Sequence, residues 1–403
     1  MIKIIKKISN SKKSKNQTSS LSKWQTTCLL ILTSIISLMI GFFVNNNINS
    51  YDKEVLKFIN DFKIIENDYY EAIDKEKVLK KAMEAIINEL NDPYSEVVDD
   101  SLSNTLNTEL NGEYSGFGIR IANTKDNEIM IYEIIKDSPA SKSNLKPGDI
   151  ILKMDAKDVS KMSTTEFTAE VKKLNKQEIE LTVIRNNKNI SINIKRDVVV
   201  LDSVLSKTFI KEKSKIGYIY INVFAANTGK QFIKELNKLE KDGINSLIID
   251  VRGNTGGHLT AVEYILNNML DNKKIIYQLE TKNNIQKIYS TGKKDKKYPI
   301  SILIDKSSAS GSEMLAISLK ENLKAKIVGI SSFGKGTVQE VGNTENTEIN
   351  YKLTTKKWLS PKGNWIHNKG VKPDYKIELE EKYFISPSDD NDNQLQKAIE
   401  ILK

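Results

Sequence analysis

The stretch ISILIDKSSASGSE, residues 300–313, carries the pattern that decides how the second half of the chain folds. Residues 300–304 are a short, largely apolar run that predicts a buried strand, and a cluster of serines follows directly. The sequence beyond the cluster predicts a helix through Lys320. A strand that hands over to a helix at Ser310 exposes that side chain and points the free N–H groups of the helix N-terminus towards developing negative charge.

Strand and helix patterns alternate on both sides of this stretch. We expect strands over 216–223, 246–251 and 327–330, and helices over 228–241 and 259–270. The uninterrupted apolar run at 246–251 is typical of a parallel strand that is covered on both faces. Alternation of this kind predicts an α/β core over residues 198–380, in which helices pack on a mixed sheet.

Residues 111–197 show a period of two instead. A glycine turn at 116–118 leads into an alternating strand, and we expect further strands over 128–134, 179–185 and 190–194 and a helix over 164–174. This order of elements, with Ser-Pro-Ala at 138–140 and LKPGDII at 145–151, resembles a PDZ domain. A small β-rich domain without a ligand is the alternative.

The resemblance to PDZ domains implies a peptide site. The carboxylate of a peptide's C-terminus would bind the backbone at Phe117, Gly118 and Ile119, and the peptide would add a strand beside the one that follows. On the predicted helix, Phe167 and Val171 would line the groove.

The N-terminus combines a basic tail with an apolar segment. Residues 1–26 contain seven lysines and no acidic residue, and residues 27–44 are uncharged and mostly apolar, close to the minimum length that spans a bilayer. Lysines before the segment and few charges after it predict a single-pass anchor in the cell membrane, with the N-terminus cytoplasmic and the bulk of the chain outside. A cleaved signal peptide is the alternative, although residues 41–45 contain no clear small-x-small site.

Charge and cysteine content exclude two classes of function. The net charge is +9, and the seven lysines of the tail leave only +2 for the rest, so we expect no nucleic-acid partner. The single cysteine, Cys28, lies in the apolar segment. The bulk of the chain therefore has no residue for a disulfide, a thiol nucleophile or a cysteine-based zinc site, and no metal or other cofactor is implied.

Helical patterns flank the two predicted domains. Residues 51–90 have apolar positions at spacings of three and four, which predicts amphipathic helices that end at 91–93. We assign them to an N-terminal helical region over residues 45–110. Residues 381–403 predict a C-terminal helical tail, with a helix over 394–402. Amphipathic helices at both ends are compatible with a homodimer.

A second segment, FGKGTVQ at 333–339, places one lysine between two glycines. Because the chain contains only two histidines, His258 and His367, we expect a serine hydrolase built here to use lysine as its base. A base near pH 7 requires the pKa of Lys335 to fall by about 3 units, or about 4 kcal/mol, which is within the range known for buried lysines. Positions 335 and 339 share a face in a strand or a helix, so Gln339 can orient the amine without adding a charge.

These assignments have rivals. Ser310 can instead be a helix cap, a role that Ser307, Ser308 and Ser312 also suit. Residues 329–335 have the spacing of a phosphate-binding loop, but Gly336 stands where a serine or threonine is needed, and a β-like segment follows. A Ser-His-Asp triad through His258 is the only histidine-based alternative, and a structural role is expected for both histidines.

The glycine-rich loop at 253–257 offers backbone N–H donors at the end of a predicted strand. Together with the amide of Gly311, this loop can form the two-donor oxyanion hole that acyl transfer needs.

Taken in order, these motifs resemble the C-terminal processing peptidases, also called tail-specific proteases. They are the helical arm, the PDZ-like domain, Asp-x-Arg-x-Asn-x-Gly-Gly at 250–257, Ser-Ala-Ser-x-Ser-Glu at 308–313, Phe-Gly-Lys-Gly-x-Val-Gln at 333–339, and further matches at 91–95, 358–363 and 370–374. The resemblance implies that Ser310 is the nucleophile, Lys335 the general base and Gln339 its orienting partner.

The same resemblance implies that Gly311 and either Gly256 or Gly257 supply the oxyanion amides. Gly311 stands where the family usually has alanine, a change that retains the N–H but loosens the turn.

The leading hypothesis is a membrane-anchored serine endopeptidase that recognises protein C-termini through its PDZ domain and cleaves with a Ser-Lys pair. Its partners would be proteins or peptides with free C-termini. One alternative is a catalytically inactive PDZ scaffold that binds protein tails at the cell surface, although a scaffold needs none of Ser310, Lys335 and Gln339. Another is a protease held inactive until a PDZ ligand or partner binds.

Overall fold

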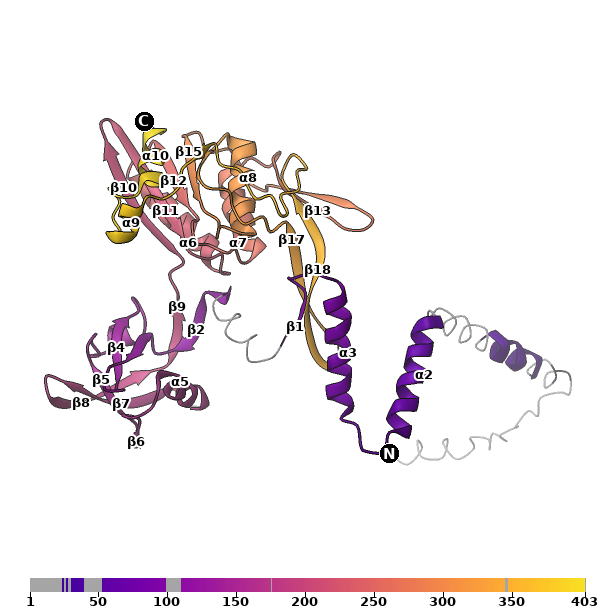
Figure 1. Cartoon of the computed structure of the whole chain (residues 1–403). Helices are drawn as coiled ribbons and strands as arrows, with labels where there is room; N and C mark the ends of the chain where they lie inside the picture. Colours follow the sequence, from indigo (N-terminus) through magenta and orange to yellow (C-terminus); the bar gives the residue numbers. More distant parts are fainter. Residues whose placement is uncertain are drawn as a thin grey trace, which may run out of the picture. The chain divides into compact units, whose positions relative to one another are not determined.

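The structure is a computed structural model that describes residues 24, 27, 30–39, 53–98, 110–174, 176–344 and 347–402. The chain divides into two compact units, Met1–Ala82 and Met83–Lys403. Figure 1 shows the helices and strands in chain order.

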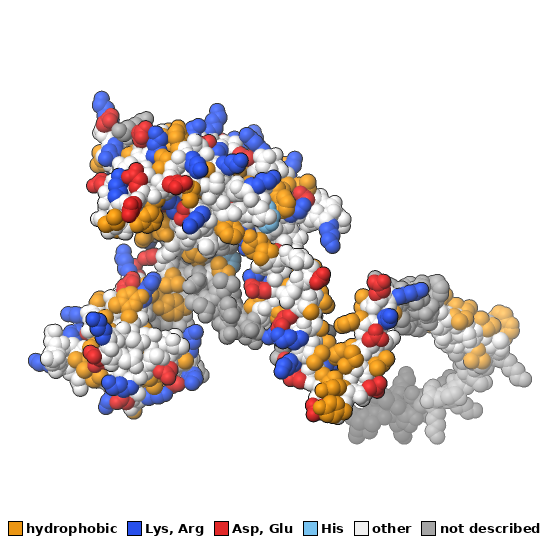
Figure 2. Space-filling model, in the orientation of Figure 1, with side chains coloured by type: hydrophobic (Ala, Val, Ile, Leu, Met, Phe, Trp, Pro, Cys, Tyr) orange, Lys and Arg blue, Asp and Glu red, His pale blue; other side chains and the backbone are white. Residues whose placement is uncertain are grey.

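The N-terminal helices leave much of their apolar surface exposed. They are α2, Lys53–Asp68, and α3, Lys75–Glu89. No side chain of α2 is buried, and Val55 and Phe58 are 48% and 58% exposed. Figure 2 shows hydrophobic side chains at the surface of this helical region.

In the part of the chain that the structure describes, no helix is both long enough and apolar enough to cross a membrane. Of the predicted anchor at 27–44, residues 27 and 30–39 are described, and these are helical. The remainder of the predicted anchor lies outside the described residues.

A β-rich domain with its own hydrophobic core follows. Its elements are β2 (Glu113–Gly116), β3 (Ile119–Asn123), β4 (Ile129–Ile134), the 3₁₀ helix η1 (Ala140–Lys142), β5 (Ile150–Met154), β6 (Lys157–Asp158), α5 (Thr164–Lys173), β7 (Glu178–Arg185), β8 (Lys188–Lys195) and β9 (Asp197–Val200). The main sheet has the order β3-β4-β5-β7-β8, and β2 and β9 form a separate two-stranded ribbon. Because β3 lies at the edge of its sheet, one side of its backbone is free to pair with another strand.

The second domain is built on a six-stranded mixed sheet. Its elements are β10 (Val204–Lys211), β11 (Ser214–Ile221), α6 (Thr228–Lys241), β12 (Ser246–Asp250), α7 (Leu259–Met269), β15 (Ile300–Ile304), α8 (Gly311–Leu323), β16 (Lys326–Gly329), β19 (Tyr375–Lys376), α9 (Glu381–Ile385) and α10 (Asn393–Glu400). The strand order is β10-β11-β12-β15-β16-β19, in which β10 pairs antiparallel with β11 and all other pairs are parallel.

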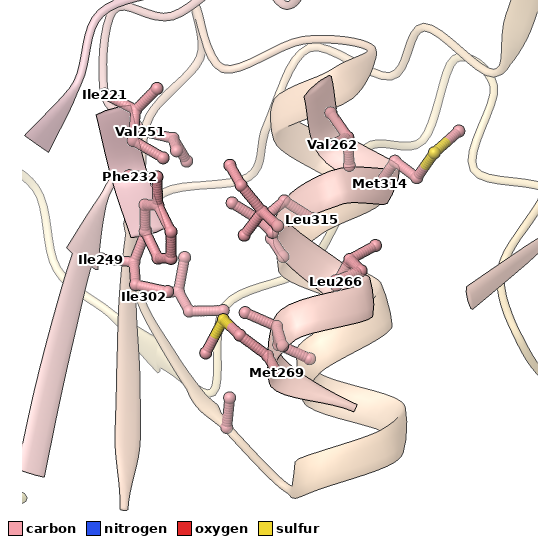
Figure 3. Packing of buried hydrophobic residues seen from close by; sticks show 14 of the residues in the cluster. Ile221, Phe232, Ile249, Val251, Val262, Leu266, Met269, Ile302, Met314 and Leu315 are labelled. Atoms are coloured by element: carbon pink, nitrogen blue, oxygen red, sulfur yellow. The ribbon is translucent and has the colours of Figure 1, made fainter. Parts of the chain in front are cut away.

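Alternate residues of the central strands contribute to two different cores. Ile249 and Ile302 belong to the core that includes side chains of α6, α7 and α8, part of which is shown in Figure 3. Ile248 and Leu303 belong to the core on the other side, which includes Leu395 of α10. Coverage on both faces explains why these strands are apolar throughout, and it confirms the predicted α/β class with a mixed sheet.

A second, five-stranded sheet carries the segment around Lys335. Its elements are β1 (Glu96–Val98), β13 (Ile275–Glu280), β14 (Ile285–Tyr289), β17 (Thr337–Thr344) and β18 (Thr347–Leu359). The order is β1-β18-β13-β14, and β17 also pairs with β18. All of these pairs are antiparallel.

Candidate active site

Ser310 lies between β15 and α8, immediately before the first helical residue. Its backbone has φ +51° and ψ −111°, a region that non-glycine residues rarely occupy. The loop is held in place by the loop that follows β12. Ala309 donates its N–H to the carbonyl of Asn254 at 3.1 Å, and the hydroxyls of Ser308 and Ser312 donate to carbonyls of that same loop at 2.8 Å. Ser308 and Ser312 thus have anchoring roles, whereas Ser310 stays partly exposed.

The glycine-rich loop after β12 packs directly against Ser310. A Cβ atom on Gly256 would lie 2.9 Å from the Cβ of Ser310 and 3.1 Å from the N of Gly311, so only glycine allows this approach. The N–H of Gly256 donates to Oδ1 of Asn254 at 2.8 Å. The N–H groups of Gly257 and Gly311, in contrast, donate to no other residue that the structure describes. These two amides are therefore the available pair for an oxyanion.

Glu313 connects the two segments singled out in the sequence. Its carboxylate is fully buried, and Oε2 accepts the backbone N–H of Ser310 and that of Lys335, each at 2.8 Å. Oε1 accepts the N–H of Gly334 at 2.6 Å and the hydroxyl of Ser332 at 2.5 Å. Burial raises the pKa of Glu313, and these four hydrogen bonds oppose that effect. The sequence shows Glu313 three residues after the candidate nucleophile, but we assigned it no role there.

Lys335 lies just before β17, with its amine partly buried. Burial lowers the pKa of the amine and the positive charge of Lys352 adds to this effect, whereas Asp92 and Glu313 act against it. The Nζ atom lies 4.7 Å from the centre of the Tyr94 ring. Residues 337–344 form a strand rather than a helix, so the segment lacks the helix that a phosphate-binding loop requires.

Gln339 lies on β17, and its side-chain amide is hydrogen-bonded to two threonines. Nε2 donates to the hydroxyls of Thr337 and Thr354, each at 3.0 Å. Among the described residues, no hydrogen bond joins the Lys335 amine to the hydroxyl of Ser310 or to Gln339. The three predicted residues thus belong to neighbouring segments, but in this conformation they form no hydrogen-bonded chain.

The two histidines have different surroundings. His258 precedes α7, and its buried Nε2 atom has no hydrogen-bond partner among the described residues, so it does not accept the Ser310 hydroxyl as the base of a triad would. His367 accepts the N–H of Gly336 through Nδ1 at 3.3 Å and stacks on Trp365 with a centroid distance of 5.0 Å. The structure therefore places His367 beside the Lys335 segment, which the sequence spacing did not indicate.

The charged pair of the Asp-x-Arg motif fixes the fold around the site. Arg252 donates to Asp250 at 2.6 Å and to Asp392, which precedes α10, at 2.7 Å. Both carboxylates are almost completely buried. The network ties the loop after β12 to the C-terminal tail and does not involve Ser310.

The β-rich domain contains a turn suited to binding a carboxylate. The carbonyls of Phe117 and Gly118 accept N–H groups of Ala140 and Ile135 at 2.8 and 2.9 Å, which fixes the turn. The N–H groups of Phe117 and Gly118 donate to no residue in the described ranges. The turn leads into β3 at Ile119, as the sequence analysis expected.

A groove of about 430 Å³ lies between β3 and α5. It is lined by Ile121, Thr164, Thr165, Thr168, Ala169 and Lys172. Phe167, which we expected in this groove, is instead 97% buried in the domain core, and Val171 packs against the same core. The reason is helical periodicity: positions 167 and 171 form the apolar stripe of α5, and the more polar side faces the groove.

Comparison with known proteins gives matches along most of the chain. Family models match for peptidase family S41 over residues 215–377, for a PDZ domain over 115–195, and for the activating protease CtpB N-terminal domain over 43–101. The carboxy-terminal processing protease CtpB of Bacillus subtilis (strain 168) is 35% identical over 339 residues, which is 83% of this chain and 70% of that protein.

A probable CtpA-like serine protease of Staphylococcus aureus (strain COL) is 32% identical over 369 residues, covering 89% of this chain and 73% of that protein. Among solved structures, the photosystem II D1 C-terminal processing protease aligns with a TM-score of 0.49 at 21% identity, covering 81% of this chain and 94% of that chain.

Proposed function

Since the chain belongs to peptidase family S41, whose C-terminal processing proteases are serine-type peptidases with a PDZ domain, we propose that it is a membrane-anchored endopeptidase that recognises protein C-termini and cleaves with Ser310 and Lys335. The observation that carries the catalytic assignment is the carboxylate of Glu313, which accepts the backbone N–H groups of both residues. Two segments that are 25 positions apart are thereby tied into one site.

The proposed chemistry gives each of these residues one role. Lys335 as the neutral amine takes the proton of the Ser310 hydroxyl, and the oxygen attacks the carbonyl carbon of the substrate. The amides of Gly257 and Gly311 donate to the resulting oxyanion. Collapse of the intermediate breaks the C–N bond, and the Lys335 ammonium gives its proton to the leaving amine. The neutral Lys335 then takes a proton from the water that attacks the acyl-enzyme, and Ser310 regains this proton as the acid product leaves. The lowered pKa of Lys335 supports this role, because a base must be neutral at the working pH.

Capture of the substrate is assigned to the β-rich domain. A peptide would pair with the free edge of β3, with its carboxylate at the unpartnered N–H groups of Phe117 and Gly118. The groove between β3 and α5 would then receive side chains of the peptide.

A resting form of the protease is the second candidate. It is favoured by the Lys335 amine, which contacts the ring of Tyr94 and makes no hydrogen bond to Ser310 or Gln339 within the described residues. On this reading, binding of a tail or partner must bring Lys335 and Gln339 into a hydrogen-bonded arrangement before turnover begins.

The location and assembly are proposed from the ends of the chain. Residues 27–44 are uncharged and mostly apolar and follow a lysine-rich tail, which supports a membrane anchor with the protease outside the cytoplasm. The exposed apolar side chains of α2 support a homodimer formed through the N-terminal helices.

The proposal is tested with Ser310→Ala and Lys335→Ala in the full-length protein in detergent. We expect each variant to lose nearly all cleavage of a peptide that ends in a free carboxylate, whereas Ser307→Ala, from the same serine cluster, retains it. A serine-reactive probe should label Ser310 in the parent protein, as detected by mass spectrometry of the digest. Undiminished turnover in Ser310→Ala or Lys335→Ala would contradict the catalytic assignment. Binding of a peptide tail without any labelling of Ser310 would favour the scaffold alternative.

A further inference from the structure

The segment Asn91–Ser95, which has no role in the proposed mechanism, is held firmly against β18. The strand that follows it, β1, pairs antiparallel with β18. The hydroxyl of Ser95 accepts the N–H of Thr354 at 3.0 Å and donates to the carboxylate of Asp92 at 2.6 Å. Asp92 also accepts the N–H of Tyr94 at 3.2 Å. These bonds give the Tyr94 backbone a defined position next to the Lys335 segment.

The Tyr94 ring is placed for a cation–π contact. The Lys335 Nζ lies 4.7 Å from the ring centre, inside the roughly 6 Å range of such contacts. The ring also makes an edge contact with His367, at a centroid distance of 6.3 Å and 70° between the planes. His367 is itself stacked on Trp365, whose Nε1 donates to the carbonyl of Gly336 at 2.9 Å. Tyr94 therefore contacts a second ring that is itself held by stacking.

The charges around Lys335 act in both directions. Asp92 and Glu313 favour the ammonium form, whereas Lys352 on β18 disfavours it, and Lys352 is in turn paired with Glu96 on β1. The Tyr94 ring also favours the ammonium form, because an aromatic ring attracts a cation more strongly than a neutral amine. Burial is the effect that these contacts oppose.

We propose that Tyr94 is a positioning residue that holds the Lys335 amine, as the charged ammonium, over its ring in the resting protein. This inference rests on the proposed role of Lys335 as the base. It explains why a partly buried lysine that must act as a base has no hydrogen bond to Ser310 within the described residues. Release of the amine from the ring, by loss of its proton or by movement of the Asn91–Ser95 turn, is then a step that precedes attack.

The test compares Tyr94→Leu, which retains apolar volume but removes the ring, with Tyr94→Phe, which retains the ring. Tyr289→Leu is the matched control, since Tyr289 is a half-exposed tyrosine on β14 of the same sheet. The full-length protein carries Ser310→Ala, so that the measurement does not depend on catalysis. Acetic anhydride, which acetylates an amine only in its neutral form, is applied over a range of pH, and acetylation of Lys335 is quantified by peptide mass spectrometry.

We expect Tyr94→Leu to lower the midpoint of Lys335 labelling by about 0.5–1 pH unit, from the typical strength of a cation–π contact. Tyr94→Phe and Tyr289→Leu should leave the midpoint unchanged. The proposal is overturned if the midpoint of Lys335 labelling in Tyr94→Leu equals that of the parent protein. It is also overturned if Tyr94→Phe shifts this midpoint as far as Tyr94→Leu does. Thermal unfolding of each variant identifies any that fails to fold, and Tyr94→Met then replaces Tyr94→Leu.

A second readout uses the active protein. With Ser310 intact, the rising limb of the plot of kcat/KM against pH should shift to lower pH in Tyr94→Leu, by the same amount of about 0.5–1 unit. At a given pH on that limb, kcat/KM should then be about 3–10-fold higher than in the parent protein. A limb that stays in place in Tyr94→Leu overturns the proposal. Failure of the proposed function is seen separately, as turnover that survives Lys335→Ala, and the labelling midpoint still decides the role of Tyr94 in that event.

Discussion

Ser310 and Lys335 donate their backbone N–H groups to the same oxygen of Glu313, each at 2.8 Å. The side chain of Glu313 is fully buried, and its other oxygen accepts two further hydrogen bonds from the Lys335 segment. The backbones of the candidate nucleophile and the candidate base are therefore held by one carboxylate at the start of α8. Any change at this carboxylate affects both segments.

Glu313→Gln should impair folding and catalysis together. The amide places an NH₂ group opposite donors that now share a carboxylate oxygen, so at least one buried N–H or O–H loses its acceptor. We expect the free energy of unfolding to fall by about 1–3 kcal/mol. We also expect kcat to fall more than KM rises, because the relative placement of Ser310 and Lys335 is disturbed. Denaturant titration and steady-state kinetics measure the two effects.

Glu321→Gln is the matched control for that change. Glu321 also lies on α8 and also accepts a hydroxyl and a backbone N–H, from Ser360 and Lys362. It has no contact with Ser310 or Lys335 among its hydrogen bonds in the described chain. This control should lose stability while retaining kcat; equal losses of kcat in both glutamine variants would contradict a special role for Glu313.

The ionisation of Lys335 should appear in the pH dependence of stability. Burial lowers the pKa of this amine in the folded protein below its ordinary value of 10.5, so the unfolded chain binds more protons between the two values. Stability from this group therefore increases as pH rises through that window. Compared with Lys335→Met, the parent protein should gain free energy of unfolding as pH approaches 10.5. A difference between the two proteins that stays constant with pH would contradict the lowered pKa.

Gly256→Ala should lower kcat strongly, whereas Gly253→Ala should not. Both glycines have positive φ, +107° and +74°, so alanine costs about 1–2 kcal/mol of backbone strain at either position. Only at Gly256 would the new methyl group approach Ser310 and Gly311, to about 3 Å, whereas Gly253 faces open space. We expect a loss of kcat of about 100-fold or more at 256. Similar kcat values in the two variants would argue against the close approach.

Ala169→Trp tests the groove between β3 and α5. Ala169 is exposed and lines the groove, so the indole should fill it without disturbing the domain core. We expect binding of a peptide with a free C-terminus to weaken at least tenfold, as measured by fluorescence anisotropy. Lys173→Trp, an exposed position on the same helix outside the groove lining, is the control and should bind normally. Equal binding by the two variants would place the tail elsewhere.

Much of the fold could be predicted from the sequence, because apolar runs and turn residues act over short stretches of chain. Apolar runs such as 246–251 and 300–304 identify buried strands, and both lie at the centre of the mixed sheet. The PDZ domain is similarly evident from its turn residues and element order. The prediction that Phe167 lines the peptide groove was not met. Phe167 belongs to the apolar stripe of α5, and that stripe faces the core rather than the groove.

By itself, the sequence determined much of the order of strands and helices, the family, and the residues that we propose for acyl transfer, because periodicity, turn residues and motif spacing act within short stretches. Only the tertiary structure decided which atoms meet. Glu313 joins segments 25 positions apart, Tyr94 reaches Lys335 from across the chain, and the amide of Gly256 is taken by Asn254 whereas that of Gly257 is not. Such contacts depend on how the two sheets and α8 pack together, and no local pattern encodes that packing.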